Sequence, residues 1–391
     1  MIERVIKFSG DAEAYLTVPD AGSGPGLVLF HDVADDDRDL RDLCCLFAEE
    51  GYVVLAPRAL AIAKGAEDVV AVVEALRGRS ECTGKIGALG FGLGGKLAYL
   101  AATEAAVDCA VSYYGFGIDF GLNFAQRIAC PLVIHLAERD PQIRPQAVER
   151  IKEAFAGRPD VSIYLYPAAA PGFDRKGRPS FDKSTASLAH SRTIALLRKV
   201  MGPHYDLEAL WEKHTTYEFV TRDVGATMQT MIAEPYVNHI PVMTGGVGQR
   251  DLARFYAHHF IPKLPADTRL VPISRTVGAD RLVDEMLLCF THDVEIDFML
   301  PGVPPTGKYV EVPTVAIVNF RGGKLCHEHI YWDQASVLVQ IGLLDPNGLP
   351  VAGIDAAKKL VDETRPSNTL MKRWAESAPG ITGQAIDEPG P

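Results

Sequence analysis

The chain has 391 residues, of which 47% are hydrophobic and 23% are charged. It is longer than one typical single-core domain, and its composition is that of an ordinary globular protein. Lys and Arg total 39 and Asp and Glu total 50, which gives a formal net charge of −11. This acidic balance disfavours a nucleic-acid backbone or an anionic membrane surface as the main partner and favours a small-molecule substrate.

The cysteines and the first residues indicate the compartment. Seven cysteines are irregularly spaced and contain no C-x-x-C pair, as expected for free thiols in a reducing environment. The opening MIERVIKFSGDAEAYL lacks a basic segment followed by an apolar run. No apolar stretch approaches the ~20 residues that a membrane-spanning helix needs. We therefore expect a cytoplasmic protein without a membrane segment.

The first half of the chain alternates short apolar runs with helical patterns. Strands are expected at 26–32, 52–57 and 85–91 and in the segments DCAVSYYG, PLVIHLAE and VSIYLYP. Helices are expected at 38–52, 66–76 and 94–105. Strands that are apolar on both sides and alternate with helices predict an α/β fold, in which helices cover both faces of a doubly wound parallel sheet.

A domain boundary is expected at Met201-Gly202-Pro203, where this alternation ends. The first domain would then span residues 1–202 and the second 203–364. The second contains helical stretches near 206–232 and 248–262, followed by long strands that we expect to pair antiparallel in an α+β layout. Residues 365–391 are rich in Pro, Gly, Ser and Ala, which predicts a loose tail.

A glycine-rich segment, Gly90-Phe91-Gly92-Leu93-Gly94-Gly95, lies at an expected strand-to-helix turn. In α/β-hydrolases such a turn is the nucleophile elbow, G-x-S-x-G or its cysteine version. The middle residue here is Gly92, which has no side chain that could attack a substrate. His31 or His190 could act as a base, but a base cannot replace a missing nucleophile. Cys44 and Cys45 are poor alternative nucleophiles, because we expect their side chains to be buried.

The surroundings of this turn resemble the dienelactone hydrolase family over roughly residues 20–200. The segments GYVVLAPRAL, PLVIHLAERDP and YLYPAAAPGF carry the resemblance. It implies an α/β-hydrolase fold with Asp140 at the position of the triad acid and Pro171 at that of the histidine. Since acyl transfer needs a nucleophile and a base within reach, we expect this domain to be inactive and Asp140 to cap a helix. A structural platform, an oligomerisation surface or a relic pocket lined by Asp32 and Arg58 remain open.

The stretch from about Leu207 to Leu344 resembles the SnoaL-like polyketide cyclases, a branch of the nuclear transport factor 2-like fold. The matching residues are His239-Ile240-Pro241, Pro305-Thr306-Gly307-Lys308 and the segment from Gly323 through Asp333 to Gly342. The resemblance implies an α+β cone, a curved sheet wrapped by helices around an apolar pocket. It also implies catalysis by a carboxylate and histidines without a metal or another cofactor.

The last long strand gathers polar side chains. Alternation places His327, His329, Tyr331 and Asp333 on one face and Glu328, Ile330 and Trp332 on the other. We expect the first face to line the pocket, because buried polar groups need partners or a wet cavity. The resemblance puts Asp333 at the catalytic aspartate, so we expect a general base whose pKa is raised in an apolar cone. The alternative is an N-cap for the helix that follows.

Further residues complete the expected site. His329 and His239 are the other catalytic candidates, each with an ordinary core histidine as the alternative. The expected substrate-binding residues, for which core packing or a solvated face is the alternative, are Tyr331, Trp332, His292, Glu285, Arg275 and Tyr236. His327 and His329 could join His239 or Glu285 around a metal, but we expect none.

These observations predict an enzyme that works on a small apolar carbonyl compound, lactone or epoxide by isomerisation, cyclisation or hydrolysis in the C-terminal pocket. A dienelactone hydrolase-type hydrolase with unconventional residues is one alternative. A non-catalytic small-molecule-binding or scaffold protein is another. A homodimer is expected, because cones of the SnoaL-like kind often pair through their sheets.

Overall fold

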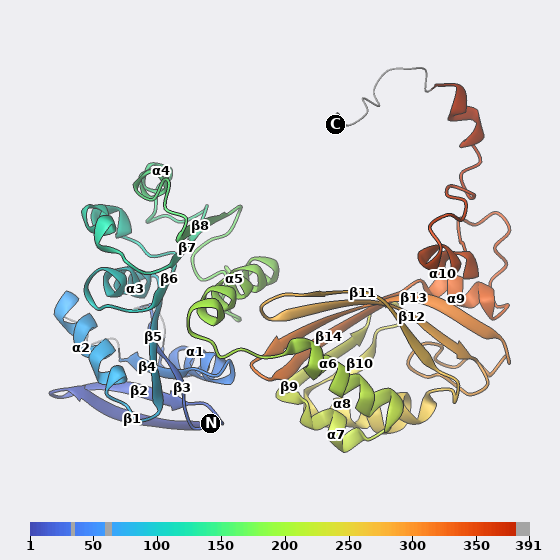
Figure 1. Cartoon of the computed structure of the whole chain (residues 1–391), viewed down its shortest axis with the longest axis horizontal. Coiled ribbons are helices and arrows are strands. Elements are labelled where there is room, and N and C mark those ends of the chain that lie inside the picture. Colours follow the sequence, from blue (N-terminus) through green and yellow to red (C-terminus); the bar gives the residue numbers. More distant parts are fainter. Residues whose placement is uncertain (33–35, 59–64, 381–391) are drawn as a thin grey trace. The chain divides into compact units, whose positions relative to one another are not determined.

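A computed structural model describes residues 1–32, 36–58 and 65–380, and the chain divides into two units (Figure 1). Unit 1 comprises Met1–Asp206 with the short segments Gly278–Asp280 and Arg321–Gly323. Unit 2 comprises Leu207–Val277, Arg281–Phe320 and the chain from Lys324 onward. Residues 381–391 of the expected tail lie outside the described residues. None of the described helices is long and apolar enough to cross a membrane.

Unit 1 is built on an eight-stranded sheet in the order β1-β2-β4-β3-β5-β6-β7-β8. The strands are β1 (Ile2–Ser9), β2 (Ala12–Val18), β3 (Gly24–Phe30), β4 (Val53–Pro57), β5 (Cys82–Phe91), β6 (Cys109–Tyr113), β7 (Leu132–Ala137) and β8 (Val161–Tyr166). From β4 to β8 the neighbours pair in parallel, as the two-sided apolar runs predict. The sequence did not predict β1 and β2, an antiparallel hairpin whose second strand also pairs antiparallel with β4.

Helices cover both faces of this sheet (Figure 1). Residues of α2 (Ala66–Arg77), α3 (Leu93–Glu104) and α4 (Pro145–Ala154) share one core, and those of α1 (Asp37–Glu49) and α5 (Lys183–Met201) share the other. In α1 the buried residues Leu40, Leu43, Cys44 and Phe47 form one apolar stripe at helical spacing. The expected doubly wound α/β fold is therefore confirmed for this half of the chain.

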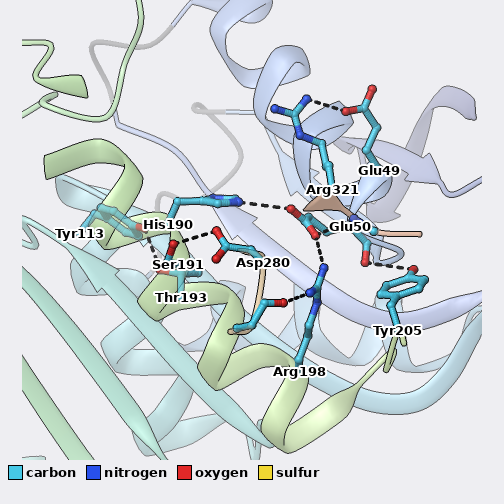
Figure 2. Close-up of polar contacts among 12 residues, drawn as sticks. Glu49, Glu50, Tyr113, His190, Ser191, Thr193, Arg198, Tyr205, Asp280 and Arg321 are labelled. Atoms are coloured by element: carbon cyan, nitrogen blue, oxygen red, sulfur yellow. Dashed lines mark hydrogen bonds and ion pairs between the residues drawn. The ribbon is translucent and has the colours of Figure 1, made fainter. Parts of the chain in front are cut away.

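A buried carboxylate, Glu50, organises polar contacts inside unit 1 (Figure 2). Its side chain lies 2.7 Å from Arg198 Nη2 and 3.2 Å from His190 Nε2, both on α5, and accepts the Gly322 N–H at 3.0 Å. Burial would raise the pKa of Glu50, but the hydrogen bond from His190 and the positive charges of His190 and Arg198 outweigh it and hold the pKa below its usual value. Glu50 follows α1 directly, so this network joins the end of α1 to α5.

Unit 2 is built on a six-stranded sheet in the order β10-β9-β14-β13-β12-β11. The strands are β9 (Met231–His239), β10 (Thr244–Val247), β11 (Arg269–Val277), β12 (Arg281–Thr291), β13 (Tyr309–Arg321) and β14 (Lys324–Trp332). The pairs β9–β10, β11–β12 and β12–β13 are antiparallel. The long strands β11, β12 and β13 thus pair antiparallel as expected, and the sheet is mixed because β14 pairs with β9 in parallel.

Three helical segments of unit 2 lie along one side of this sheet (Figure 1). These are α6 (Leu207–Thr215), which continues into a π-helical turn at Thr216–Val220, α7 (Val224–Gln229) and α8 (Gly248–Phe255). Two further helices are α9 (Gln334–Gln340) and α10 (Ile354–Val361). Ala357 of α10 packs with Leu287 and Cys289 of β12. Since β12 directs Met286 and Leu288 into a cavity, α10 lies on the opposite face of the sheet.

Candidate functional site

Unit 2 contains a cavity of about 60 Å³ with a largely apolar wall. The apolar lining includes Phe219, Phe260, Met286, Leu288, Phe298 and Trp332. At roughly 10–15 Å³ for each water, such a space admits several water molecules, so it suits a small compound. A few polar groups interrupt the wall, among them Glu218, His239 and Glu328. An apolar cavity with a few convergent polar groups is the usual form of a small-molecule site.

The polar groups centre on His214, Glu218 and Glu328. His214 and Glu218 lie one helical turn apart along α6 and its π-helical continuation, and Glu328 lies on β14. His214 Nε2 lies 3.1 Å from Glu218 Oε1 and 3.3 Å from Glu328 Oε1. None of the three residues is more than 3% exposed. One imidazole therefore bridges two carboxylates beside the cavity.

Neighbouring threonines fix the orientation of His214. Thr230 Oγ1 donates its single proton to the Thr227 carbonyl at 2.6 Å. At 2.6 Å from His214 Nδ1, Thr230 Oγ1 must therefore accept, and Nδ1 must carry a proton. Burial would lower the pKa of His214, but the charges of Glu218 and Glu328 outweigh it and raise the pKa to about 10. With a proton on each ring nitrogen, His214 donates Nε2–H to Glu218 Oε1 at 3.1 Å and forms an ion pair with Glu328 at 3.3 Å.

Two buried oxygens beside this cluster lack hydrogen bonds. Among the described residues, Glu328 Oε1 makes the ion pair with His214 but no hydrogen bond, and Tyr256 Oη has no hydrogen-bond partner. Burial raises the pKa of Glu328, and His214 offsets part of that rise. Burial, followed by the nearby charges of Glu218 and Glu328, raises the pKa of Tyr256 well above its usual value. The cavity wall thus carries a basic carboxylate, Glu328, and a protonated phenol, Tyr256.

A second buried contact supports the helix that carries His214. The Trp211 ring stacks on the His214 ring with centroids 5.7 Å apart, and Trp211 Nε1 donates to Asp284 Oδ2 at 2.8 Å. Arg275 binds both oxygens of Asp284 at 3.1 Å. Arg275, predicted to bind substrate, is instead paired with a buried acid that anchors α6 to β12.

The cluster also has the donor atoms of a metal site. His214, Glu218 and Glu328 offer ligand atoms that all lie within 4.8 Å of one another. Imidazole and carboxylate ligands suit zinc, manganese or iron, and the Nδ1 contact to Thr230 resembles the outer hydrogen bond of many metal-bound histidines. A divalent cation bound to His214 Nε2 would take the place of the proton on that nitrogen, so the cluster can hold one or the other.

Asp333 does not reach the cavity. It is exposed and caps α9, accepting the N–H groups of Ala335 at 3.0 Å and Ser336 at 3.2 Å and the Ser336 hydroxyl at 2.6 Å. The prediction that Asp333 lies inside the cone is therefore wrong. The alternative prediction, that Asp333 is the N-cap of the following helix, agrees with this geometry.

The face of β14 expected to line the pocket points the other way. His329 is half-buried, its ring 5.4 Å from that of Tyr236 and 5.0 Å from that of His327, and Tyr331 is 40% exposed. Glu328, Ile330 and Trp332 line the cavity instead. The predicted alternation is present, but its direction was assigned wrongly, because the face that carries Glu328 together with the apolar Ile330 and Trp332 turns inward.

The remaining predicted residues divide between the cavity and other places. His239 and Trp332 line the cavity. His292 is fully buried beside Thr306, with 3.1 Å between Nδ1 and Oγ1, and is not part of that lining. Glu285 is half-buried and accepts the Ser274 hydroxyl at 2.7 Å.

Sequence reasoning missed His214, Glu218 and Tyr256 and placed Glu328 on the wrong side. Two signals were present. His214 and Glu218 are four residues apart in a helical stretch, with Trp211 on the same face. Glu328 alternates with Ile330 and Trp332, and a lone carboxylate on an apolar strand face is a stronger sign of a buried functional group than a row of polar residues.

The glycine-rich turn of unit 1 retains an unusual backbone. Gly92 connects β5 to α3 with φ 56° and ψ −121°, a conformation that favours glycine. A Cβ at this residue would overlap the carboxylate of Asp32. Asp140 is 8% exposed and accepts N–H groups from Gln142 at 2.8 Å and Ile143 at 3.3 Å, which caps the turn before α4. Burial raises the pKa of Asp140 despite these bonds.

Comparison with known proteins identifies this half of the chain. The dienelactone hydrolase family model matches residues 58–201. A putative carboxymethylenebutenolidase of Azospirillum brasilense is 30% identical over 226 residues, which cover 95% of that protein and 49% of this chain. The chain belongs to the dienelactone hydrolase family. A carboxymethylenebutenolidase of Pseudomonas sp. (strain P51) is 26% identical over 221 residues, covering 92% of that protein and 50% of this chain.

The dienelactone hydrolase family match lies within unit 1. A crystal structure of a putative dienelactone hydrolase from Klebsiella pneumoniae subsp. pneumoniae MGH 78578 is similar with a TM-score of 0.45 and 20% identity, over 98% of that chain and 51% of this one. The segment matched by the family model contains Gly92, Asp140 and Pro171, the last half-buried in the turns after β8. The cavity of unit 2 is built from later residues, so its chemistry has to be inferred from its own side chains.

Proposed function

We propose that unit 2 is a SnoaL-like catalytic domain that carries out acid–base chemistry on a small, largely apolar carbonyl compound, lactone or epoxide. The observation that carries the proposal is Glu328, a carboxylate 3% exposed on the wall of an apolar cavity, whose Oε1 lacks a hydrogen bond among the described residues. Burial that raises its pKa makes Glu328 a stronger base than a surface carboxylate.

The other groups of the cluster have complementary roles. Glu328 accepts a proton from the carbon next to a carbonyl, and the phenol of Tyr256 donates a hydrogen bond to the oxygen that gains negative charge. His214 is a positioning residue that holds Glu218 and Glu328 and balances their charge. Isomerisation or cyclisation can follow from the resulting enolate, and hydrolysis from a water that Glu328 activates. The general base proposed here is thus Glu328 in place of Asp333.

The test uses cyclohexanone as a probe of proton abstraction. The intact protein in D₂O should accelerate deuterium exchange at the carbons beside the carbonyl, followed by nuclear magnetic resonance. Glu328→Gln keeps the shape of the side chain and removes the base, so the rate should fall by about 100-fold or more. Unchanged exchange in Glu328→Gln would remove Glu328 from the mechanism.

The matched control is Asp333→Asn on the same segment. Asn caps helices about as well as Asp, so this variant should fold and exchange at the wild-type rate. If the exchange rate fell in Asp333→Asn and stayed at the wild-type level in Glu328→Gln, the general base would be Asp333, as the sequence suggested. Dialysis against EDTA should leave the rate unchanged, since we propose a proton on His214 Nε2; a loss that zinc or manganese restores would assign the cluster to a metal.

Family membership favours a second candidate, hydrolysis of a lactone in unit 1, because relatives are described as carboxymethylenebutenolidases. Gly92 lacks a nucleophile, so a fluorophosphonate or iodoacetamide probe should not label residues 88–96. Peptide mapping after labelling checks this, with an active serine esterase treated in parallel to show that the probe is competent. A modified residue in that segment would favour hydrolysis in unit 1.

If neither unit turns over a substrate, the third alternative, a small-molecule-binding or scaffold protein, remains. The homodimer and the cytoplasmic location expected from the sequence also remain predictions.

A further inference from the structure

One wall of the unit 2 cavity carries a histidine outside the carboxylate cluster. His239, at the end of β9, is 5% exposed and lines the cavity. Four aromatic rings surround it, with centroids 5.4 to 5.7 Å from its own: Phe255, Phe260, Phe298 and Trp332. In these apolar surroundings, the ring nitrogen of His239 that carries the proton determines whether a ligand must donate or accept a hydrogen bond.

The neighbouring hydroxyl settles which nitrogen carries that proton. Thr244 Oγ1 donates to the Phe298 carbonyl at 2.6 Å. A hydroxyl has one proton, so at 3.1 Å from His239 Nδ1 the Thr244 oxygen can only accept, and Nδ1 must be the donor. Burial lowers the pKa of His239 to about 4, which leaves a single ring proton at neutral pH.

The second nitrogen, Nε2, therefore has a free lone pair. Nε2 has no hydrogen-bond partner in the described part of the chain, since the contacts of His239 are those to Thr244 and to the aromatic rings. The imidazole of His239 thus accepts a hydrogen bond from a ligand and cannot donate one. A carbonyl, ether or epoxide oxygen gains nothing here, whereas a hydroxyl does.

We infer that the substrate of unit 2 bears a hydroxyl group that donates to His239 Nε2, in addition to the carbonyl on which Glu328 and Tyr256 act. The substrate class is then a small hydroxylated carbonyl compound. This inference rests on the proposed function, because it assigns a second contact in the same cavity. His239 acts as a specificity-determining residue, and Thr244 as the positioning residue that holds its tautomer.

The experiment compares 4-hydroxycyclohexanone with 4-methylcyclohexanone, which differ by a hydroxyl and a methyl of similar size. The wild-type protein should bind the hydroxyl compound about tenfold more tightly, as expected for one net hydrogen bond. His239→Phe should abolish or reverse this preference. Thr244→Val keeps His239 and releases its tautomer, so the preference should shrink there even if His239→Phe fails to fold.

Nitrogen-15 spectra of histidine-labelled protein provide a readout that does not depend on turnover. They should show His239 protonated at Nδ1 alone in the wild type and a mixture of tautomers in Thr244→Val. The inference would be overturned if the ratio of the two ketone affinities were the same in the wild type, His239→Phe and Thr244→Val. It would also be overturned if His239 were protonated at Nε2. Deuterium exchange on cyclohexanone would then still stand as evidence for the proposed function, so the two failures are distinguishable. Absence of binding by both ketones would overturn both.

Discussion

Glu50→Gln should lower the free energy of unfolding of unit 1 by roughly 3–5 kcal/mol, because it leaves a buried guanidinium without its counter-charge. Arg198 is 7% exposed and lies 2.7 Å from the carboxylate that the variant removes. The same change weakens the contacts of Glu50 with His190 and with the Gly322 N–H. Hydrogen exchange measured on peptides of β3 and β5 during urea titration checks the effect within unit 1 alone.

The residue beside it is the matched control. Glu49 pairs with Arg321 at 2.8 Å, but both side chains are 28% exposed. Glu49→Gln should therefore change the free energy of unfolding by at most about 1 kcal/mol. Adding Arg198→Met to Glu50→Gln should recover part of the loss, since the pair is then replaced by uncharged groups. Equal losses in Glu49→Gln and Glu50→Gln would show that burial does not set the strength of these ion pairs.

Unit 2 should lose stability as the pH rises from 6.5 to 9. The pKa of His214 is raised from 6.5 to about 10 in the folded protein by Glu218 and Glu328. Above pH 6.5 the unfolded chain has released this proton and the folded chain still holds it, so the stabilisation present at lower pH declines as the folded pKa is approached. At about 1.4 kcal/mol for each pKa unit, the expected loss is a few kcal/mol.

Hydrogen exchange on peptides of β9 and β14 between pH 6.5 and 9 measures this change, after correction for the intrinsic rate. His214→Gln should be less stable than the wild type at pH 6.5 and should show a flatter pH dependence. His239→Phe is the control. Its stability should depend on pH as steeply as that of the wild type, because a histidine with a pKa of about 4 does not titrate in this range. A wild-type stability that rises with pH would instead indicate a bound cation, whose affinity grows as its ligands lose protons.

The fold of unit 1 could be read largely from the sequence, since buried parallel strands and covering helices have distinct periodicities. The exception, β1 and β2, lies at the edge of the sheet, where β1 is largely exposed and carries no continuous apolar run. In unit 2 the parallel pairing of β14 with β9 joins segments almost a hundred residues apart, and no local pattern encodes that contact.

The candidate site could be predicted only in part. Two of the predicted site residues, His239 and Trp332, line the cavity, and the predicted alternation along β14 is present. Which of the two faces of β14 turns toward the cavity depends on which side of the sheet the helices cover. The sequence of the strand alone does not encode that side. Asp333 was misjudged because a capping aspartate and a buried base look the same in sequence. The meeting of His214 with Glu328 depends on α6 packing against β14, which is a tertiary contact.

The carboxylate of Asp32 lies where a side chain at residue 92 would begin. A serine or cysteine introduced at residue 92 would therefore require the Asp32 carboxylate, the far end of a short side chain, to move aside. Residues 32 and 92 share one space, so a change at either of them alters which side chains fit at the other.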